Sequence, residues 1–365
     1  MEKITANIKG KDKEYNIFLG SAIFPELMKN IKENYSDKKL VVITDETISK
    51  LHKGKLDELS KLGYILALPS GEQSKTRETK AKVEDMLLDK GYGRDTLIVS
   101  IGGGVICDLS GYVASTYNRG IPIIQVPTTL LSMVDASVGG KTGINTKHGK
   151  NLIGAFYQPD AVFADIDFLS TLPEGEFLNG LVEAVKISIT SDKELFSFIE
   201  SNVKKILSKD EKIMLHLVKR SIELKKGVVE KDEKESGLRQ ILNLGHTIGH
   251  ALEVNSEFKE KHGFCVSKGI IVELRISESL GELQKDNLDK IIKLINDLKL
   301  PSKIDKNIQE DKLIGLMVVD KKSKQQKPYF VIVKEIGKVK SENNKYSFSI
   351  EESAIKKSIE LSKND

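Results

Sequence analysis

The chain has 365 residues, of which 39% are hydrophobic and 30% are charged, a composition typical of a folded globular protein. Its 57 basic and 53 acidic residues are dispersed along the sequence and leave a net charge of only +4, which argues against a nucleic-acid-binding surface. No apolar run approaches the roughly 20 residues of a membrane span, and residues 1–4 do not resemble a signal peptide. With only Cys107 and Cys265 present, we expect a cytoplasmic protein without a disulfide bond.

Strand-like and helical segments alternate in the first half of the chain. Residues 1–19, with a turn at 9–12, predict an antiparallel hairpin. Apolar runs at 40–45, 96–101 and 121–126 predict buried strands, and residues 76–90 predict a helix between two of them. Buried strands separated by helices indicate a mostly parallel sheet with helices on its faces.

From about Leu172 onward, the apolar residues recur with helical spacing. The predicted helices cover residues 177–190, 211–231, 247–254, 265–280 and 287–298, the first of them beginning near Glu174. Residues 328–333 and the turn at Gly337 predict a short strand pair, and no structure is assigned after Lys345. We therefore expect an α/β domain over residues 1–168 and a mainly α-helical domain over residues 169–365.

Three consecutive glycines, Gly102 to Gly104, follow one predicted strand and lead into a helix. Such a turn lets backbone amides at a helix N-terminus approach a diphosphate. The dinucleotide fingerprint is incomplete, because Cys107 stands where a third Gly or Ala is expected. A tight turn without a ligand is an equally good interpretation of this segment alone.

Polar residues also follow two other strands. Asp45 ends one strand, where a carboxylate can bind ribose hydroxyls or cap the helix that follows. Residues 71–75 follow the next strand and include Glu72 and Lys75. Ligands of parallel sheets collect at the carboxyl ends of the strands, so we expect these residues to lie at the same edge as the glycine turn.

Three of the six histidines, His246, His250 and His262, occur close together in the sequence, and with Glu183 they could form a metal site. Imidazole nitrogens with one carboxylate suit zinc and leave a position for substrate. Glu183 also lies three residues from Lys186, so an ordinary ion pair is the alternative. His246 and His250 share a helix face, and their spacing does not decide which of them binds a metal.

Several longer motifs follow one another along nearly the whole chain. They include Gly102-Gly-Gly-Val-Ile-Cys-Asp108-Leu, Val134-Asp135-Ala-Ser-Val-Gly-Gly-Lys141-Thr-Gly and Asn243-Leu-Gly-His246-Thr-Ile-Gly-His250-Ala-Leu-Glu. The remaining motifs occupy residues 117–120, 126–131, 149–156, 171–173, 180–186 and 232–239. In their order and spacing, these motifs resemble those of the 3-dehydroquinate synthase family, which belongs to the sugar phosphate cyclases.

The resemblance implies conversion of 3-deoxy-D-arabino-heptulosonate 7-phosphate into 3-dehydroquinate and phosphate, a step of the shikimate pathway. NAD+ would oxidise the C5 alcohol, phosphate would be eliminated, NADH would return the hydride, and the ring would open and reclose by an intramolecular aldol step. The active site would lie in a cleft between the two domains. The resemblance also implies a homodimer in which Arg119 reaches the neighbouring site.

The same resemblance assigns roles to individual residues. A divalent metal, Zn2+ or Co2+, would be held by Glu183, His246 and His262, and His250 would relay a proton. The substrate, a phosphorylated sugar acid, would be surrounded by Lys141, Lys186, Lys225, Arg239, Asn243, Asn151, Asp135, Glu235, Arg119 and one lysine of the pair Lys321 and Lys322. NAD+ would be bound by Asp45, Gly71, Glu72, Gln73, Lys75, Gly103, Gly104, Val105, Asp108, Thr128, Thr129, Lys141, Lys150, Thr171 and Glu176.

The sequence departs from the family at two points. Cys107 replaces the Gly usual before Asp108, and Phe264-Cys265 follows His262-Gly263 where the family generally has Glu-Ala. The second change leaves open what supports His262, and Cys265 is an alternative metal ligand.

Three other functions fit parts of the pattern: another sugar phosphate cyclase, a metal-dependent polyol dehydrogenase of the same fold, or a non-catalytic nucleotide-binding protein. Lys225 and Arg239 favour a carboxylated substrate and therefore the synthase.

Overall fold

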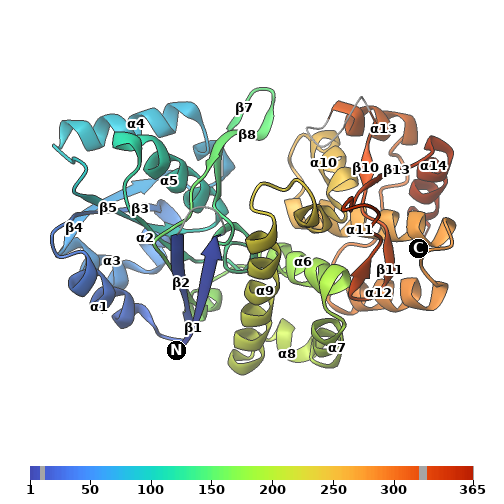
Figure 1. Ribbon diagram of the computed structural model, residues 1–365, viewed down its shortest axis with the longest axis horizontal. Helices are drawn as coiled ribbons and strands as arrows, with labels where there is room; N and C mark the ends of the chain where they lie inside the picture. Colours follow the sequence, from blue (N-terminus) through green and yellow to red (C-terminus); the bar gives the residue numbers. More distant parts are fainter. Residues whose placement is uncertain (9–12, 320–326, 365) are drawn as a thin grey trace. The chain divides into compact units, whose positions relative to one another are not determined.

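A computed structural model describes residues 1–8, 13–319 and 327–364 (Figure 1). The chain divides into two compact units, Met1–Phe177 with Met214–Lys226 and Leu178–Ile213 with Gly227–Asp365. The sequence places the change between domains at residue 168, where strands give way to helices. The compact units divide later, within α6 (Glu174–Ser191), and the middle of α9 (Glu211–Lys231) belongs to the first unit. The spacing of apolar residues indicates where strands give way to helices, but it does not show which neighbours a helix packs against.

The first unit is built on a seven-stranded sheet in the order β1-β2-β9-β6-β5-β3-β4. The strands are β1 (Glu2–Ile8), β2 (Lys13–Gly20), β3 (Lys39–Asp45), β4 (Gly63–Leu68), β5 (Thr96–Gly102), β6 (Ile123–Pro127) and β9 (Ala161–Asp165). All neighbours are parallel except β1 and β2, which pair from Glu2 with Leu19 to Ile8 with Lys13. The predicted mostly parallel sheet and terminal hairpin are confirmed, and the hairpin's predicted turn, residues 9–12, lies outside the described residues.

Helices cover both faces of this sheet (Figure 1). They are α1 (Phe24–Asn34), α2 (Glu46–Leu51), α3 (Lys53–Ser60), α4 (Arg77–Asp89) and α5 (Gly104–Thr116). Apolar residues of α4 and α5 pack on one face against Val41, Ile43 and Ile98, which are fully buried. Burial of both faces explains why the central strands read as continuous apolar runs in the sequence.

The strand order places a topological switch point between β3 and β5. From β3 the chain passes to β4 on one side, whereas from β5 it passes through α5 to β6 on the other. Ligands of open parallel sheets bind where neighbouring connections diverge in this way. Asp45 ends β3 and Gly102 ends β5, so both lie at this point.

The first unit also contains a separate antiparallel hairpin, β7 (Lys141–Thr146) and β8 (Gly149–Phe156). The hairpin packs against α5, where Thr142 Cγ2 would lie 2.4 Å from a Cβ placed on Gly111. Only a glycine at this helix position allows such an approach.

The second unit is mainly helical, as the sequence predicts. It contains most of α6 and, among the described residues, α7 (Lys193–Ser201), α8 (Val203–Leu207), α10 (His246–Asn255), α11 (His262–Ser279), α12 (Lys285–Asp297), α13 (Glu310–Val319) and α14 (Glu352–Leu361). One buried cluster joins apolar residues of α10, α11, α13 and α14. Among the described residues, no helix has the length and apolar character needed to cross a bilayer.

The short strand pair predicted from residues 328–333 and the Gly337 turn is present, but residues 328–333 are divided between two strands. The segment is split into β10 (Tyr329–Phe330), which pairs with β13 (Phe348–Ser349), and β11 (Val333–Glu335), which pairs with β12 (Lys338–Val339) across the Gly337 turn. Side chains of α11 explain the interruption. Val331 N donates to Glu273 Oε2 at 3.2 Å and Val333 N donates to Ser277 Oγ at 3.0 Å, which takes both amides away from strand pairing.

Candidate metal centre and nucleotide-binding edge

Three helices of the second unit bring together the acid and two histidines singled out in the sequence. Glu183 of α6 directs its Oε1 atom at His246 Nε2 of α10, 3.8 Å away, and at His262 Nε2 of α11, 3.9 Å away. Glu183 is only 4% exposed, and its Oε1 has no hydrogen-bond partner among the described residues. A buried carboxylate oxygen needs a partner. Because zinc binds N and O ligands at about 2.0–2.2 Å, ligand atoms this close together can share one ion.

Lys186 contacts the other oxygen of the same carboxylate. Its Nζ donates to Glu183 Oε2, so the ion pair given as the alternative is present, and it leaves Oε1 facing the two imidazoles. The two carboxylate oxygens therefore face different groups, a lysine on one side and two imidazoles on the other.

Each of these imidazoles is oriented through its other nitrogen. His246 Nδ1 lies 3.2 Å from the carbonyl oxygen of Leu244, and His262 Nδ1 lies 3.2 Å from Glu253 Oε2. Such contacts leave Nε2 of each ring toward Glu183. Ligand histidines in proteins are commonly oriented in this way.

Glycines allow α10 and α11 to approach closely enough for this geometry. A Cβ on Gly269 would lie 2.1 Å from the carbonyl oxygen of Gly245, and a Cβ on Gly249 would lie 3.0 Å from Val266 Cα. Gly245 also begins α10 with a left-handed backbone, φ +77°, a conformation that glycine adopts without strain. The result is a separation of 5.2 Å between the ring centroids of His246 and His262.

The structure places His246 and His250 in two different groups of possible metal ligands, which the sequence does not distinguish. His246 belongs with Glu183 and His262, whereas His250 belongs to a second group with Glu253 and His262 whose ligand atoms lie within 4.8 Å of one another. His250 remains a neighbour of the first group, with ring centroids 5.5 Å from His246. Cys265 is fully buried and is part of neither group, and burial raises the pKa of its thiol, which disfavours the thiolate a metal needs.

A segment of the same unit that ends in a 3-10 helix, Leu238–Asn243, holds Arg239 and Asn243. Asp232 accepts hydrogen bonds from the backbone amides of Ser236, Gly237 and Arg239 at 2.7–3.0 Å. Burial opposes ionisation of Asp232, but these amides and the Ser236 hydroxyl outweigh it and lower its pKa. Arg239 is 2% exposed, and Asn243 Nδ2 donates to Glu235 Oε1 at 2.5 Å. Three residues that the sequence predicts around the substrate, Arg239, Asn243 and Glu235, therefore lie together in this segment.

In the first unit, Lys225 of α9 contacts Asp135. Its Nζ lies 2.5 Å from both the backbone oxygen and Oδ1 of Asp135, within a π-helical turn, Ser132–Ala136. Such turns are rare and occur often at functional sites. A hairpin of the same unit carries three further predicted polar residues: Lys141 begins β7, and Lys150 and Asn151 lie on β8. Asn151 has a left-handed backbone, φ +55°, and its amide donates to Asn145 Oδ1 at 3.0 Å.

The glycine turn lies at the sheet edge that the sequence predicts. Gly103 precedes the first residue of α5, and Gly104 and Val105 form its first turn. A Cβ on Gly103 would lie 3.1 Å from Thr129 Cγ2, and Thr128 Oγ1 is buried without a hydrogen-bond partner among the described residues. Cys107 is accommodated in the core, where Sγ lies 3.6 Å from the Gly102 oxygen. Burial also raises the pKa of this thiol.

Lys75 forms an ion pair with Asp108 at the same edge, with Nζ and Oδ2 2.5 Å apart. Burial raises the pKa of Asp108, which Lys75 opposes. Glu72 Oε1 accepts from Asn145 Nδ2 at 2.6 Å, and Gln73 lies on the same short 3-10 turn, Glu72–Ser74, which follows Gly71. This loop connects the strand edge to the β7–β8 hairpin.

Asp45 caps α2, which confirms the capping role that the sequence offers beside ribose binding. Both of its hydrogen bonds, from Ile48 N and Ser70 Oγ at 3.0 Å, reach Oδ1. Thr171 Oγ1 lies 2.8 Å from His52 Nε2, and burial lowers the pKa of His52. Glu176 lies in the first turn of α6.

Arg119 lies at the other end of α5 from the glycine turn. It is exposed, has a left-handed backbone with φ +69°, and follows a helix of 13 residues, about 20 Å long at 1.5 Å per residue. An arginine side chain is much shorter than that helix. Lys321 and Lys322 lie outside the described residues.

Three residues of this region are absent from the sequence-based set: Glu253, Asp232 and Asn179, the last of which contacts Gly263 at the start of α11. Glu253 and Asp232 fall within the family motifs, so the sequence could have pointed to them, whereas Asn179 lies one residue before a motif.

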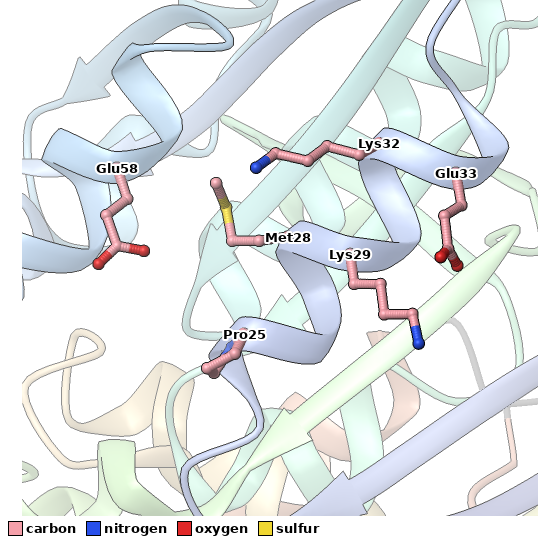
Figure 2. Close-up of a pocket in the computed structure, with 6 residues that line it drawn as sticks. All are labelled: Pro25, Met28, Lys29, Lys32, Glu33 and Glu58. Carbon is pink, nitrogen blue, oxygen red and sulfur yellow. The ribbon is translucent and has the colours of Figure 1, made fainter.

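A surface hollow of about 370 Å3 lies elsewhere, between α1 and α3, and is lined by Pro25, Met28, Lys29, Lys32, Glu33 and Glu58 (Figure 2). None of the predicted site residues lines it.

Comparison with known proteins agrees with the motifs. A family profile described as 3-dehydroquinate synthase N-terminal matches residues 65–179, and one described as 3-dehydroquinate synthase C-terminal matches residues 180–323. The 3-dehydroquinate synthase of Dictyoglomus thermophilum is 43% identical over 349 residues, which cover 94% of this chain and 95% of that protein. That of Thermodesulfovibrio yellowstonii is 39% identical and covers 93% and 96%.

Solved structures share the fold. A 2-deoxy-scyllo-inosose synthase, complexed with carbaglucose-6-phosphate, NAD+ and Co2+, has a TM-score of 0.90 at 24% identity and covers 99% of this chain and 100% of its own. The 2-epi-5-epi-valiolone synthase of Streptomyces hygroscopicus, with NAD+ and Zn2+ bound, has a TM-score of 0.85 at 23% identity and covers 96% of both chains. On the family profiles and the relatives at about 40% identity, this chain belongs to the 3-dehydroquinate synthase family.

Proposed function

We propose that this chain converts 3-deoxy-D-arabino-heptulosonate 7-phosphate into 3-dehydroquinate and phosphate, with NAD+ acting catalytically. Family membership supports the reaction, since relatives of nearly full length are named 3-dehydroquinate synthase. The observation that carries the proposal is the buried Glu183 Oε1, which faces two imidazole nitrogens at 3.8 and 3.9 Å.

We assign Glu183, His246 and His262 as the ligands of a divalent metal, Zn2+ or Co2+. Their nitrogen and oxygen donors suit either ion, and three protein ligands leave a position for substrate. When bound, such an ion would polarise the hydroxyl groups of the substrate and favour hydride loss. Lys186, whose Nζ contacts Glu183 Oε2, holds the carboxylate so that its other oxygen faces the two histidines.

We assign NAD+ to the carboxyl edge of the sheet, where it would accept the C5 hydride and later return it. The N-terminus of α5 and the amides of the glycine turn suit a diphosphate. Thr128 offers a buried hydroxyl there. Asp45 would bind ribose hydroxyls through Oδ2, because Oδ1 already accepts the bonds that cap α2.

We propose that the phosphate and carboxylate of the substrate are bound by cationic residues of this chain. Lys186, Lys225 and Arg239 are buried cations with acidic or carbonyl partners. Buried cations retain their charge only with such partners, and an anionic substrate adds another. Asp135, Lys141, Asn151, Glu235 and Asn243 complete this set.

His250 would transfer a proton at the reacting hydroxyl. It neighbours both ligand histidines, with ring centroids 5.5 Å from His246 and 5.9 Å from His262, so it lies beside the place where substrate would meet the metal. The departing phosphate would itself serve as the base for elimination, so no further strong base is required of the chain.

The proposed enzyme is a cytoplasmic homodimer in which Arg119 serves the neighbouring subunit. The position of Arg119 at the far end of α5 supports this role, since its side chain cannot reach the glycine turn of its own subunit. Mixing an Arg119→Ala variant with a Glu183→Ala variant should restore activity in hybrid dimers. Absence of recovery despite demonstrated subunit exchange would contradict a shared site.

One assay separates the synthase from its alternatives. The heptulosonate phosphate is supplied with trace NAD+, and phosphate release and nicotinamide absorbance are followed together. The proposal predicts phosphate in large excess over NAD+ without accumulation of NADH. A polyol dehydrogenase would accumulate NADH with its own substrate, and another sugar phosphate cyclase would release phosphate only from a different sugar phosphate.

A further inference from the structure

Glu253 makes a contact that the proposed reaction does not yet use. It lies in α10, is 2% exposed, and its Oε2 atom is 3.2 Å from His262 Nδ1. A buried carboxylate is costly unless it is paired. Neither the proposed ligand set nor the proposed substrate-binding set includes it.

The position of Glu253 follows from the packing of two helices. It lies three residues after His250 and seven after His246, so all three share one face of α10. The glycine contacts between α10 and α11 bring this face against His262, the first residue of α11. The carboxylate is therefore held by the same packing that places the two histidines.

The two nitrogens of His262 face two different carboxylates. Nε2 lies 3.9 Å from Glu183 Oε1, and Nδ1 lies 3.2 Å from Glu253 Oε2. A neutral imidazole carries one hydrogen, and a carboxylate accepts it from the nearer nitrogen. The other nitrogen then presents its lone pair toward Glu183.

We propose that Glu253 is a positioning residue that fixes the tautomer and ring orientation of His262 and thereby sets the metal affinity of the site. This inference rests on the proposed metal centre. It also answers the question raised by Phe264-Cys265, because the support for His262 comes from α10 and not from the residues that follow it. Removing such a partner of a ligand histidine typically costs 10- to 100-fold in metal affinity.

The test measures zinc dissociation constants of the purified, metal-free chain by competition with a chromogenic chelator. Glu253→Ala should weaken zinc binding by roughly 10- to 100-fold, and Glu253→Gln by a smaller factor, because the amide keeps an acceptor but loses the charge. Glu257→Ala is the control, since Glu257 lies in the turn just after α10 and its exposed side chain pairs with Lys259. It should bind zinc as the unchanged chain does. Thermal unfolding of each metal-free variant identifies loss of fold, and Glu253→Gln, the least disruptive change, keeps the test valid if the alanine variant unfolds.

Three results discriminate the interpretations. His262→Ala should abolish tight zinc binding, and if it does not, the metal centre itself is wrong. If His262→Ala abolishes binding but both folded Glu253 variants bind zinc within twofold of the unchanged chain, the role of Glu253 is wrong. If the chain binds two zinc ions and Glu253→Ala loses only one of them, Glu253 belongs to a second ion site with His250 and His262, which also overturns the proposal.

Discussion

Asn179 Oδ1 accepts a hydrogen bond from the backbone amide of Gly263 at 2.6 Å, and this contact joins α6 to the first turn of α11. Asn179 lies one helical turn before Glu183, and Gly263 directly follows His262. The contact therefore fixes the spacing of one proposed metal ligand from another. It also satisfies one of the amides that every helix N-terminus leaves unpaired.

Gly263 should not tolerate a methyl group. A Cβ there would lie 2.1 Å from the Asn179 backbone oxygen, so Gly263→Ala must displace the start of α11. We expect a loss of about 1–3 kcal/mol in unfolding free energy, as for other overpacked sites, together with weaker zinc binding. Urea unfolding and zinc titration measure the two effects. Gly281→Ser is the control, because a Cβ on Gly281 meets no atom within 4 Å, although its positive φ adds some strain of its own. Unchanged zinc affinity in folded Gly263→Ala would contradict this account of the helix contact.

His246 and His250 should differ in what their removal does. His246→Ala should remove the metal and all turnover, because its Nε2 faces Glu183. His250→Ala should retain the metal and turn over slowly, because the role proposed for His250 is proton transfer. Metal analysis of both purified variants makes the comparison, and loss of metal from the His250 variant alone would reverse the two assignments.

Asp45 should contribute separately to folding and to NAD+ binding. Asp45→Ala removes the cap of α2 and should cost about 1 kcal/mol of stability, whereas Asp45→Asn keeps a capping side chain and should cost little. Both variants should bind NAD+ more weakly, since neither presents a carboxylate to the ribose. Thermal unfolding and NAD+ titration separate the effects. If Asp45→Asn bound NAD+ as tightly as the unchanged chain, Asp45 would be a structural cap only.

Asp232 should make stability depend on pH in the acid range. Its pKa in the folded chain is lowered, against an ordinary value of about 3.9. A lowered carboxyl pKa gives stability that is complete above the ordinary value and is lost as pH falls through the lowered one. The unchanged chain should therefore exceed Asp232→Asn in stability at pH 6, and the difference should shrink below about pH 4. Urea unfolding across pH measures it, with exposed Asp37→Asn as control. A difference that does not vary with pH would exclude this origin.

Patterns within single elements were predictable from the sequence. The strand at residues 40–45 is a continuous apolar run because both faces of the sheet are covered, and the helical spacing of residues 211–231 matches α9, Glu211–Lys231. The proposed metal ligands were named through the family resemblance, because spacing alone left His246 and His250 as alternatives.

Contacts between distant segments could not be predicted in this way. Asn179 and Gly263 are 84 residues apart, and only the packing of α6 against α11 makes them partners. The break between β10 and β11 depends on Glu273 and Ser277 of a helix that precedes them by more than 50 residues. Periodicity describes which face of an element is buried and carries no information about such partners.

The fate of the C5 hydrogen tests the central claim most directly. Substrate labelled with deuterium at C5 is converted over many turnovers with NAD+ present in trace amount, and the product is examined by mass spectrometry and NMR. Because the same hydride is removed and returned, the account predicts full retention of deuterium at that carbon and no turnover without NAD+. Deuterium found in accumulated NADH, or phosphate release that needs no NAD+, would contradict it.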